Sequence, residues 1–100
     1  MEQVKRDIYN IILIHTARTW ERIRVSKPNQ EMVADNIEST ELIQEISTDI
    51  FSNPIVQEFI CLKVNNSVPT NFWDKEGDSF SDIYIERLAT EIINKNYIDN

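Results

Sequence analysis

The feature that most constrains this chain is a row of six carboxylates whose spacing fits a helix. Its members, three or four residues apart, are Glu31, Asp35, Glu38, Glu41, Glu45 and Asp49. Residues at this spacing lie on one side of an α-helix. The surrounding stretch from Pro28 to Leu62 holds seven Asp and Glu residues and no Lys or Arg. A helix through this acidic row therefore carries a surface of a single charge.

The composition favours helices over sheets. One glycine and three prolines among 100 residues leave few positions for the positive φ angles that tight β-turns need. A chain of this length can bury one hydrophobic core but not two. Its apolar residues recur at helical spacing, with short breaks between the helical stretches. We therefore expect an all-α protein, a compact antiparallel bundle of four or five helices that forms a single helical domain over residues 1–100.

Prolines mark the predicted ends of the first two helices. The first helix should cover residues 2–27, because Pro28 disfavours helical geometry at Lys27 and suits the first turn of a new helix. The next helical stretch continues to Phe51. Two interpretations remain open for it, one kinked helix or two helices that break near Ser39, where a hydroxyl side chain can cap a new helix. The acidic row is a single line only if the helix is continuous.

Two further helices follow in the sequence. Asn53 is the predicted N-cap of a helix with Pro54 in its first turn, and Asn65 marks its end. The last helix should run from about Phe80 to Lys95. The predicted inner positions of the first helix are Ile8, Tyr9, Ile12, Leu13, Ala17, Trp20 and Ile23. Those of the last helix are Phe80, Ile83, Tyr84, Leu88, Ile92 and Ile93.

Charge is segregated along the chain. Six Lys and Arg residues and three Asp and Glu residues precede Pro28, whereas the whole chain has a net charge of -7. The basic side of the first helix could lie beside the acidic row, where each surface ion pair contributes at most about 1 kcal/mol. Alternatively, the acidic row faces another molecule.

Residue types that carry most enzyme chemistry are scarce. His15 is the only histidine and Cys61 the only cysteine. We expect a structural role for His15, which follows four aliphatic residues, and a place in the core for Cys61, which lies in an apolar run. The single glycine excludes a Gly-rich phosphate-binding loop. We predict no catalytic residue, no metal site and no cofactor.

The N-terminal apolar run and the lone cysteine bear on location. The run from Ile11 to Ile14 is too short to span a membrane. A single cysteine forms no internal disulfide, so nothing indicates an oxidising compartment. We expect a cytoplasmic protein with no membrane partner.

An acidic stretch precedes the last helix and matches a calcium-binding loop only in part. Loop positions 1, 3, 5 and 9 are filled by Asp74, Glu76, Asp78 and Asp82. The required glycine is replaced by Ser79 and the bidentate glutamate by Ile85. We therefore interpret the stretch as an acidic loop that caps the last helix.

Two aromatic residues flank these acids. We predict that Phe72 closes one end of the bundle and that Trp73 is an anchor for a partner, because aromatic residues dominate binding hot spots.

Function is predicted from the acidic row. Carboxylates on a helix can take the place of nucleic-acid phosphates and fit the basic groove of a protein that handles nucleic acid. We expect a small acidic non-enzymatic binding protein, an inhibitor that neutralises such a partner, for example a nuclease toxin. In general character it is similar to immunity proteins that neutralise nuclease toxins and to phage-encoded inhibitors that mimic DNA. The predicted partner-binding residues are Glu31, Asp35, Glu38, Glu41, Glu45, Asp49, Trp73, Asp74, Glu76 and Asp78.

Other functions remain as alternatives. A structural or adaptor domain could act through homo- or hetero-oligomerisation, including a homodimer, with the acidic row serving only solubility. An enzyme would need His15 or the loop acids gathered in a pocket. Direct nucleic-acid binding is disfavoured because the net charge of -7 opposes phosphate.

Overall fold

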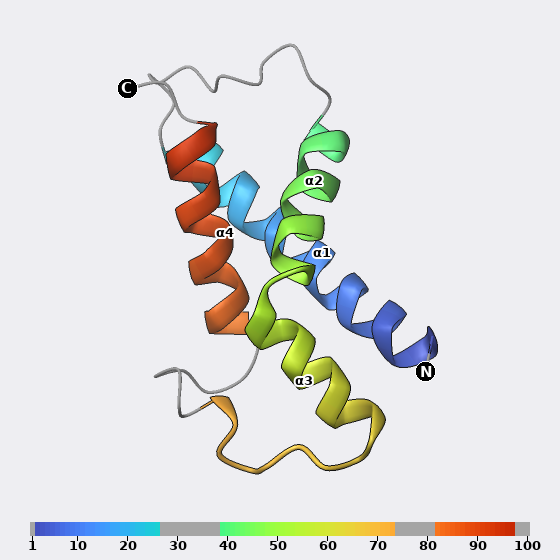
Figure 1. Ribbon diagram of the computed structural model, residues 1–100. Helices are drawn as coiled ribbons and strands as arrows, with labels where there is room; N and C mark the ends of the chain where they lie inside the picture. The colour runs from blue at the N-terminus through green and yellow to red at the C-terminus, as the bar shows by residue number, and fades with distance from the viewer. Residues whose placement is uncertain (1, 27–38, 74–81, 98–100) are drawn as a thin grey trace.

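The computed structural model describes residues 2–26, 39–73 and 82–97 (Figure 1). These residues form four α-helices and no strand. The helices are α1 (Glu2–Ser26), α2 (Ser39–Phe51), α3 (Pro54–Val64) and α4 (Asp82–Asn96). The all-α expectation is therefore confirmed. The stretch between Pro28 and Ser39, where one continuous helix was an alternative, lies outside the described residues. So does Ser79, the predicted cap of α4.

The long helix α1 contacts each of the other three helices, and α2 also contacts α3 and α4. In Figure 1, α1 passes behind α2 and α4, and α3 leads away from the end of α2. The antiparallel part of the expectation is not confirmed. The chain runs along α2 against the direction of α4, whereas α1 and α4 rise in the same general direction.

Local sequence signals fix both ends of α3. The side chain of Asn53 accepts a hydrogen bond from the backbone N–H of Ile55 at 2.9 Å, and Pro54 takes the first helical position. Asn66 ends the helix in the left-handed region with a φ of 54°. The N–H groups of Asn66 and Ser67 bond back to the carbonyls of Lys63 and Leu62, which is the Schellman arrangement. The predicted cap and end of this helix are confirmed.

The buried apolar side chains form one core, to which all four helices and the residues after α3 contribute. Its members are Ile8, Ile12, Trp20, Ile23, Leu42, Ile46, Ile50, Val56, Phe59, Ile60, Phe72, Trp73, Tyr84, Ile85, Ala89 and Ile93. Three polar residues are buried with them: Thr16, Thr19 and Ser47. Thr19 and Ser47 donate hydroxyl hydrogen bonds to the carbonyls of His15 and Ile43 within their own helices. Because the hydroxyl groups are satisfied locally, these small side chains can be buried where helices approach closely.

Two expectations about the core are wrong. On α4 the buried face follows Ile85, Ala89 and Ile93 at steps of four, so Ile83 lies to one side and is 55% exposed. Cys61 is exposed rather than in the core. The core side of α3 is taken by Val56, Phe59 and Ile60, and Cys61 points away from it.

Four aromatic rings close the end of the core formed by α3 and α4. Trp73 lies 5.1 Å from Phe59, 5.1 Å from Phe72 and 5.0 Å from Tyr84, measured between ring centroids. Phe72 and Trp73 retain only 6% and 9% of their surface. Both residues therefore close this end, whereas Trp73 was predicted to be an anchor for a partner. The Trp73 side chain leaves almost no surface accessible to a partner.

We expect the substitution Ile46→Ala to lower the free energy of unfolding by about 2–5 kcal/mol, because Ile46 is fully buried and its truncation leaves a cavity. Urea denaturation measures the change. Ile14→Ala is the matched control, since Ile14 is 52% exposed, and it should change stability by less than about 0.5 kcal/mol. Equal losses in the two variants would contradict this assignment of the core.

Candidate functional site

Three members of the acidic row lie in the described part of the chain, and all three are exposed. Glu41, Glu45 and Asp49 follow one another at steps of four along α2. Leu42, Ile46 and Ile50 occupy the adjacent positions and are buried. Residues at steps of four lie on the same side of a helix. Burial of the apolar row in the core therefore leaves the row of carboxylates facing solvent. We call Glu41, Glu45 and Asp49 the acidic face.

Tyr97, directly after α4, borders the acidic face. Burial raises the pKa of the Tyr97 hydroxyl above its usual value of about 10, and the negative charges of Glu45 and Asp49 raise it further. The ring meets Trp20 of α1 edge-on, with centroids 6.3 Å apart. Tyr97 thus lies between the core and the carboxylates of α2, a position that the sequence did not predict.

The cations of α1 form no ion pair with the acidic face in the described residues, although Lys5 and Arg6 line a groove with Thr48 of α2. Within the described residues, the ion pairs of α1 join Arg22 to Glu86 of α4 and Arg24 to Glu21 of α1 itself. No ion pair in these same ranges reaches Glu41, Glu45 or Asp49. In this half of the acidic row, direct ion pairs with the first helix are therefore absent among the described residues.

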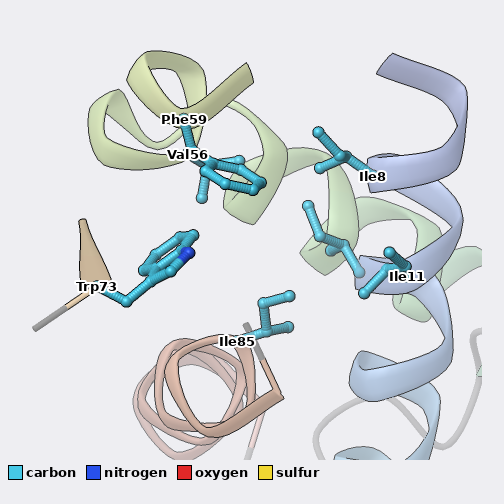
Figure 2. A pocket seen from close by; sticks show the side chains of 7 residues that line it. Ile8, Ile11, Val56, Phe59, Trp73 and Ile85 are labelled. Carbon is cyan, nitrogen blue, oxygen red and sulfur yellow. The ribbon is translucent and has the colours of Figure 1, made fainter. Parts of the chain in front are cut away.

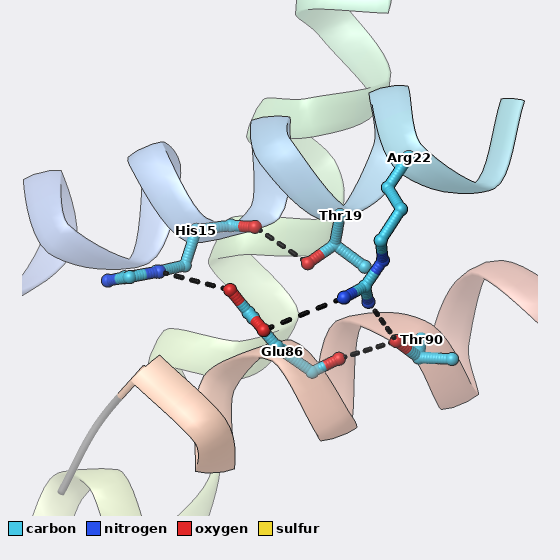
Figure 3. Close-up of polar contacts among 5 residues, drawn as sticks. All are labelled: His15, Thr19, Arg22, Glu86 and Thr90. Atoms are coloured by element: carbon cyan, nitrogen blue, oxygen red, sulfur yellow. Dashed lines mark hydrogen bonds and ion pairs between the residues drawn. The ribbon is translucent and has the colours of Figure 1, made fainter. Parts of the chain in front are cut away.

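A polar cluster at the contact of α1 with α4 is formed by His15, Arg22, Glu86 and Thr90 (Figure 3). The Glu86 carboxylate lies 3.6 Å from His15 Nδ1 and 3.7 Å from Arg22 Nη1. Arg22 also donates to the Thr90 hydroxyl at 3.4 Å, and that hydroxyl donates to the Glu86 carbonyl. The carboxylate contacts are longer than hydrogen bonds, so Arg22 and Glu86 link α1 to α4 mainly by the attraction of their opposite charges.

Beside the rings of Phe59 and Trp73, apolar side chains line a small pocket of about 20 Å³ (Figure 2). It is lined by Ile8, Ile11, Ile12, Val56, Phe59, Trp73 and Ile85. A cavity of this volume has room for about one water-sized sphere. It is a gap in the packing between α1, α3 and α4.

Six other predicted site residues fall in the two stretches between the described ranges. Glu31, Asp35, Glu38, Asp74, Glu76 and Asp78 lie outside the described residues. The described ranges contain no group of three or more His, Cys, Asp and Glu side chains that could hold a metal ion. The partial calcium-loop match falls on residues beyond these ranges, apart from Asp82, the first residue of α4, and Ile85, which is buried.

No helix in the described residues is long and apolar enough to cross a membrane. The chain matches no protein-family model, no curated protein and no solved structure.

We expect the free energy of unfolding to fall at alkaline pH through Tyr97. A raised pKa in the folded protein means that stability is fully retained below the unfolded value of about 10 and is lost as pH rises through the folded value. Urea denaturation between neutral pH and pH ~11 measures this loss. Tyr97→Phe should show a shallower fall over the same range. Identical pH profiles for the two proteins would contradict the prediction.

We expect Glu86→Gln to lower the free energy of unfolding by about 0.5–1 kcal/mol at low salt, because the carboxylate and Arg22 are partly exposed and their attraction is screened. Added salt should reduce the difference, which thermal unfolding at two ionic strengths measures. Glu91→Gln, an exposed position on the same helix, is the control. A loss of equal size in the control, or one independent of salt, would argue against the polar cluster.

Proposed function

We propose that this protein is a small non-enzymatic inhibitor that binds and neutralises a basic, nucleic-acid-handling protein, such as a nuclease toxin, through the acidic face of α2. The observation that carries the proposal is the exposure of Glu41, Glu45 and Asp49 without an ion pair to any cation in the described part of the chain. Such a single-charge surface repels itself, and a basic partner relieves that repulsion. We further propose that the protein acts in the cytoplasm.

The spacing of the acidic face supports a partner that binds phosphates. A step of four residues advances about 6 Å along a helix. Phosphates of one DNA strand are separated by about 3.4 Å along the duplex axis. Because a strand winds around that axis, adjacent phosphates lie farther apart in space than this rise, so carboxylates about 6 Å apart offer a comparable row of negative charge. A groove of Arg and Lys side chains that binds a phosphate row can therefore also meet this helix.

The net charge of -7 supports fast association with such a partner. Complementary charge steers two proteins together, and this steering weakens as salt screens the field. An inhibitor that competes with a nucleic acid gains from rapid capture. Its association rate should fall with salt more steeply than its dissociation rate changes.

The adaptor alternative has less support. Large exposed apolar side chains in the described ranges are Ile14, Val25 and Ile83, and apolar residues scattered singly on a surface are ordinary. A dimer in sedimentation experiments at micromolar concentration would restore this alternative.

The test compares two double variants that raise the net charge equally. Glu41→Lys with Asp49→Lys changes the acidic face, whereas Glu2→Lys with Glu58→Lys changes exposed acids on α1 and α3. The pairs are matched, because Glu41 and Glu2 are both first-turn acids of their helices. Each protein is immobilised, exposed to lysate of the source cells, and the retained proteins are identified and purified for binding kinetics.

We expect wild type and control to retain a basic nucleic-acid-binding protein and the acidic-face variant to bind it about tenfold or more weakly at low salt, because like charges then face each other. A DNA duplex should compete with the wild-type protein for this partner. Equal binding by the two double variants, or binding that DNA does not affect, would sink the proposal. Circular dichroism checks that both variants are folded.

A further inference from the structure

A groove of about 250 Å³ between α1 and α3 is lined mostly by apolar side chains. Its lining consists of Val4, Asp7, Ile8, Ile11, Phe59 and Lys63. We call this hollow the apolar groove, because four of these six residues are apolar. All six lie on α1 and α3, so the apolar groove is separate from the acidic face of α2.

The apolar groove continues toward the protein interior. Ile8, Ile11 and Phe59 line both the groove and the small pocket beside Trp73. Figure 2 shows Ile8, Trp73 and Ile85 on three sides of that pocket. The pocket has an entirely apolar lining and room for about one water-sized sphere. An aliphatic chain that lies in the groove can therefore place a methyl group near the Trp73 ring.

The length of the groove fits a chain of medium length. Its α1 lining runs from Val4 to Ile11, which is about 10 Å by the helical rise, and an extended aliphatic chain of about eight carbons covers this distance.

The two charged residues of the groove are not equivalent. The Asp7 carboxylate accepts a hydrogen bond from the side-chain amide of Gln3 at 2.7 Å. Lys63 is exposed, and its ammonium group forms no ion pair within the described residues. An ammonium group beside an apolar surface complements a ligand that carries one anionic end, and the Asp7 charge repels that end from its own side. The anionic end is therefore directed to Lys63.

We propose that the apolar groove binds a free medium-chain carboxylate, with its aliphatic chain between α1 and α3 and its carboxylate at the Lys63 ammonium group. Each methylene moved from water into the groove tightens binding by up to about fourfold. An exposed ion pair adds only about two- to fivefold. The affinity thus comes mainly from the chain, and Lys63 sets its direction.

The first arm of the test titrates the full chain with hexanoate, octanoate and decanoate and follows amide and tryptophan indole chemical shifts. We expect affinity to rise by up to about fourfold per added methylene. The Trp73 indole signal should move. The Trp20 signal should stay, because Trp20 packs against Tyr97 and lines neither the groove nor the pocket. Equal affinities across the series, or equal movement of both indole signals, would overturn the proposal.

The second arm fills the groove. Val4→Phe places a ring in it, and Ile14→Phe places the same ring at a position of α1 that is 52% exposed. We expect Val4→Phe to bind octanoate about tenfold or more weakly, because the ring takes the space of at least two methylenes, and Ile14→Phe to bind it as the wild type does. Circular dichroism checks that both variants are folded. Wild-type affinity in folded Val4→Phe would show that the chain lies elsewhere.

The third arm tests the anionic end and keeps the groove unchanged. Octanoate and octanol are compared in wild type, Lys63→Gln and Lys95→Gln, which is the matched control because both lysines are exposed last-turn bases of their helices. We expect Lys63→Gln to weaken octanoate by about two- to fivefold at low salt and to leave octanol unchanged. The same loss for octanol, or for octanoate in Lys95→Gln, would overturn the place of the carboxylate.

A membrane surface presents the same chemistry as a free carboxylate, and vesicles separate the two. The net charge of -7 opposes an anionic surface, so we expect the protein not to sediment with phosphatidylglycerol vesicles. Sedimentation with these vesicles that Val4→Phe abolishes would assign the groove to a membrane and overturn the proposal.

Discussion

Burial of one side of α1 against both α2 and α4 is the contact on which the rest of the fold depends, because α1 also contacts α3. The side is not uniformly apolar: Thr16 and Thr19 are buried beside Ile12 and Trp20. Threonine has nearly the shape of valine, so it packs as an apolar residue only if its hydroxyl is satisfied. Thr19 bonds to the His15 carbonyl at 2.8 Å. The Thr16 hydroxyl has no hydrogen-bond partner within the described residues, at a cost of about 1–3 kcal/mol that the packing around it must offset.

The same arrangement determines how charge is distributed. Arg22 of α1 meets Glu86 of α4, whereas the carboxylates of α2 form no ion pair with an α1 cation in the described ranges. The fold thus pairs some of its opposite charges and leaves the acidic face without a direct ion pair among these residues. The self-repulsion of the acidic face is a cost to stability that the buried side of α2, with Leu42 and Ile46 fully enclosed, offsets.

Helix class and the positions of breaks could be predicted because they depend on local signals. Asn53 and Pro54 specify the start of α3 through groups within two residues of each other, whatever surrounds them. The buried side of α4 could not be predicted in the same way. Its apolar residues allow more than one helical stripe, and packing against α1 and α2 selects the stripe with Ile85 and Ala89 over the one with Ile83. The exposure of Cys61 has the same origin, because a run of apolar residues does not determine which side of the helix α3 packs against the other helices.

For the candidate site, spacing alone predicted that Glu41, Glu45 and Asp49 share a side of a helix. The structure adds that this side is exposed, because the apolar residues next to each acid are buried. The proximity of Tyr97 to Glu45 could not be found from spacing, because Glu45 lies on α2 and Tyr97 follows α4. The burial of Trp73 depends likewise on rings from α3 and α4. Contacts of this kind are properties of the assembled fold and have no local signature.

The two ends of the core differ in how much chain they enclose. Phe59, Phe72, Trp73 and Tyr84 come from one short region, so bringing them together closes only small loops. The contact of Trp20 with Tyr97 joins opposite ends of the sequence. Loop-closure entropy grows with the length enclosed, and local contacts form faster than distant ones. The end built around Trp73 can therefore assemble early in folding, and the contact of Trp20 with Tyr97 forms among the last.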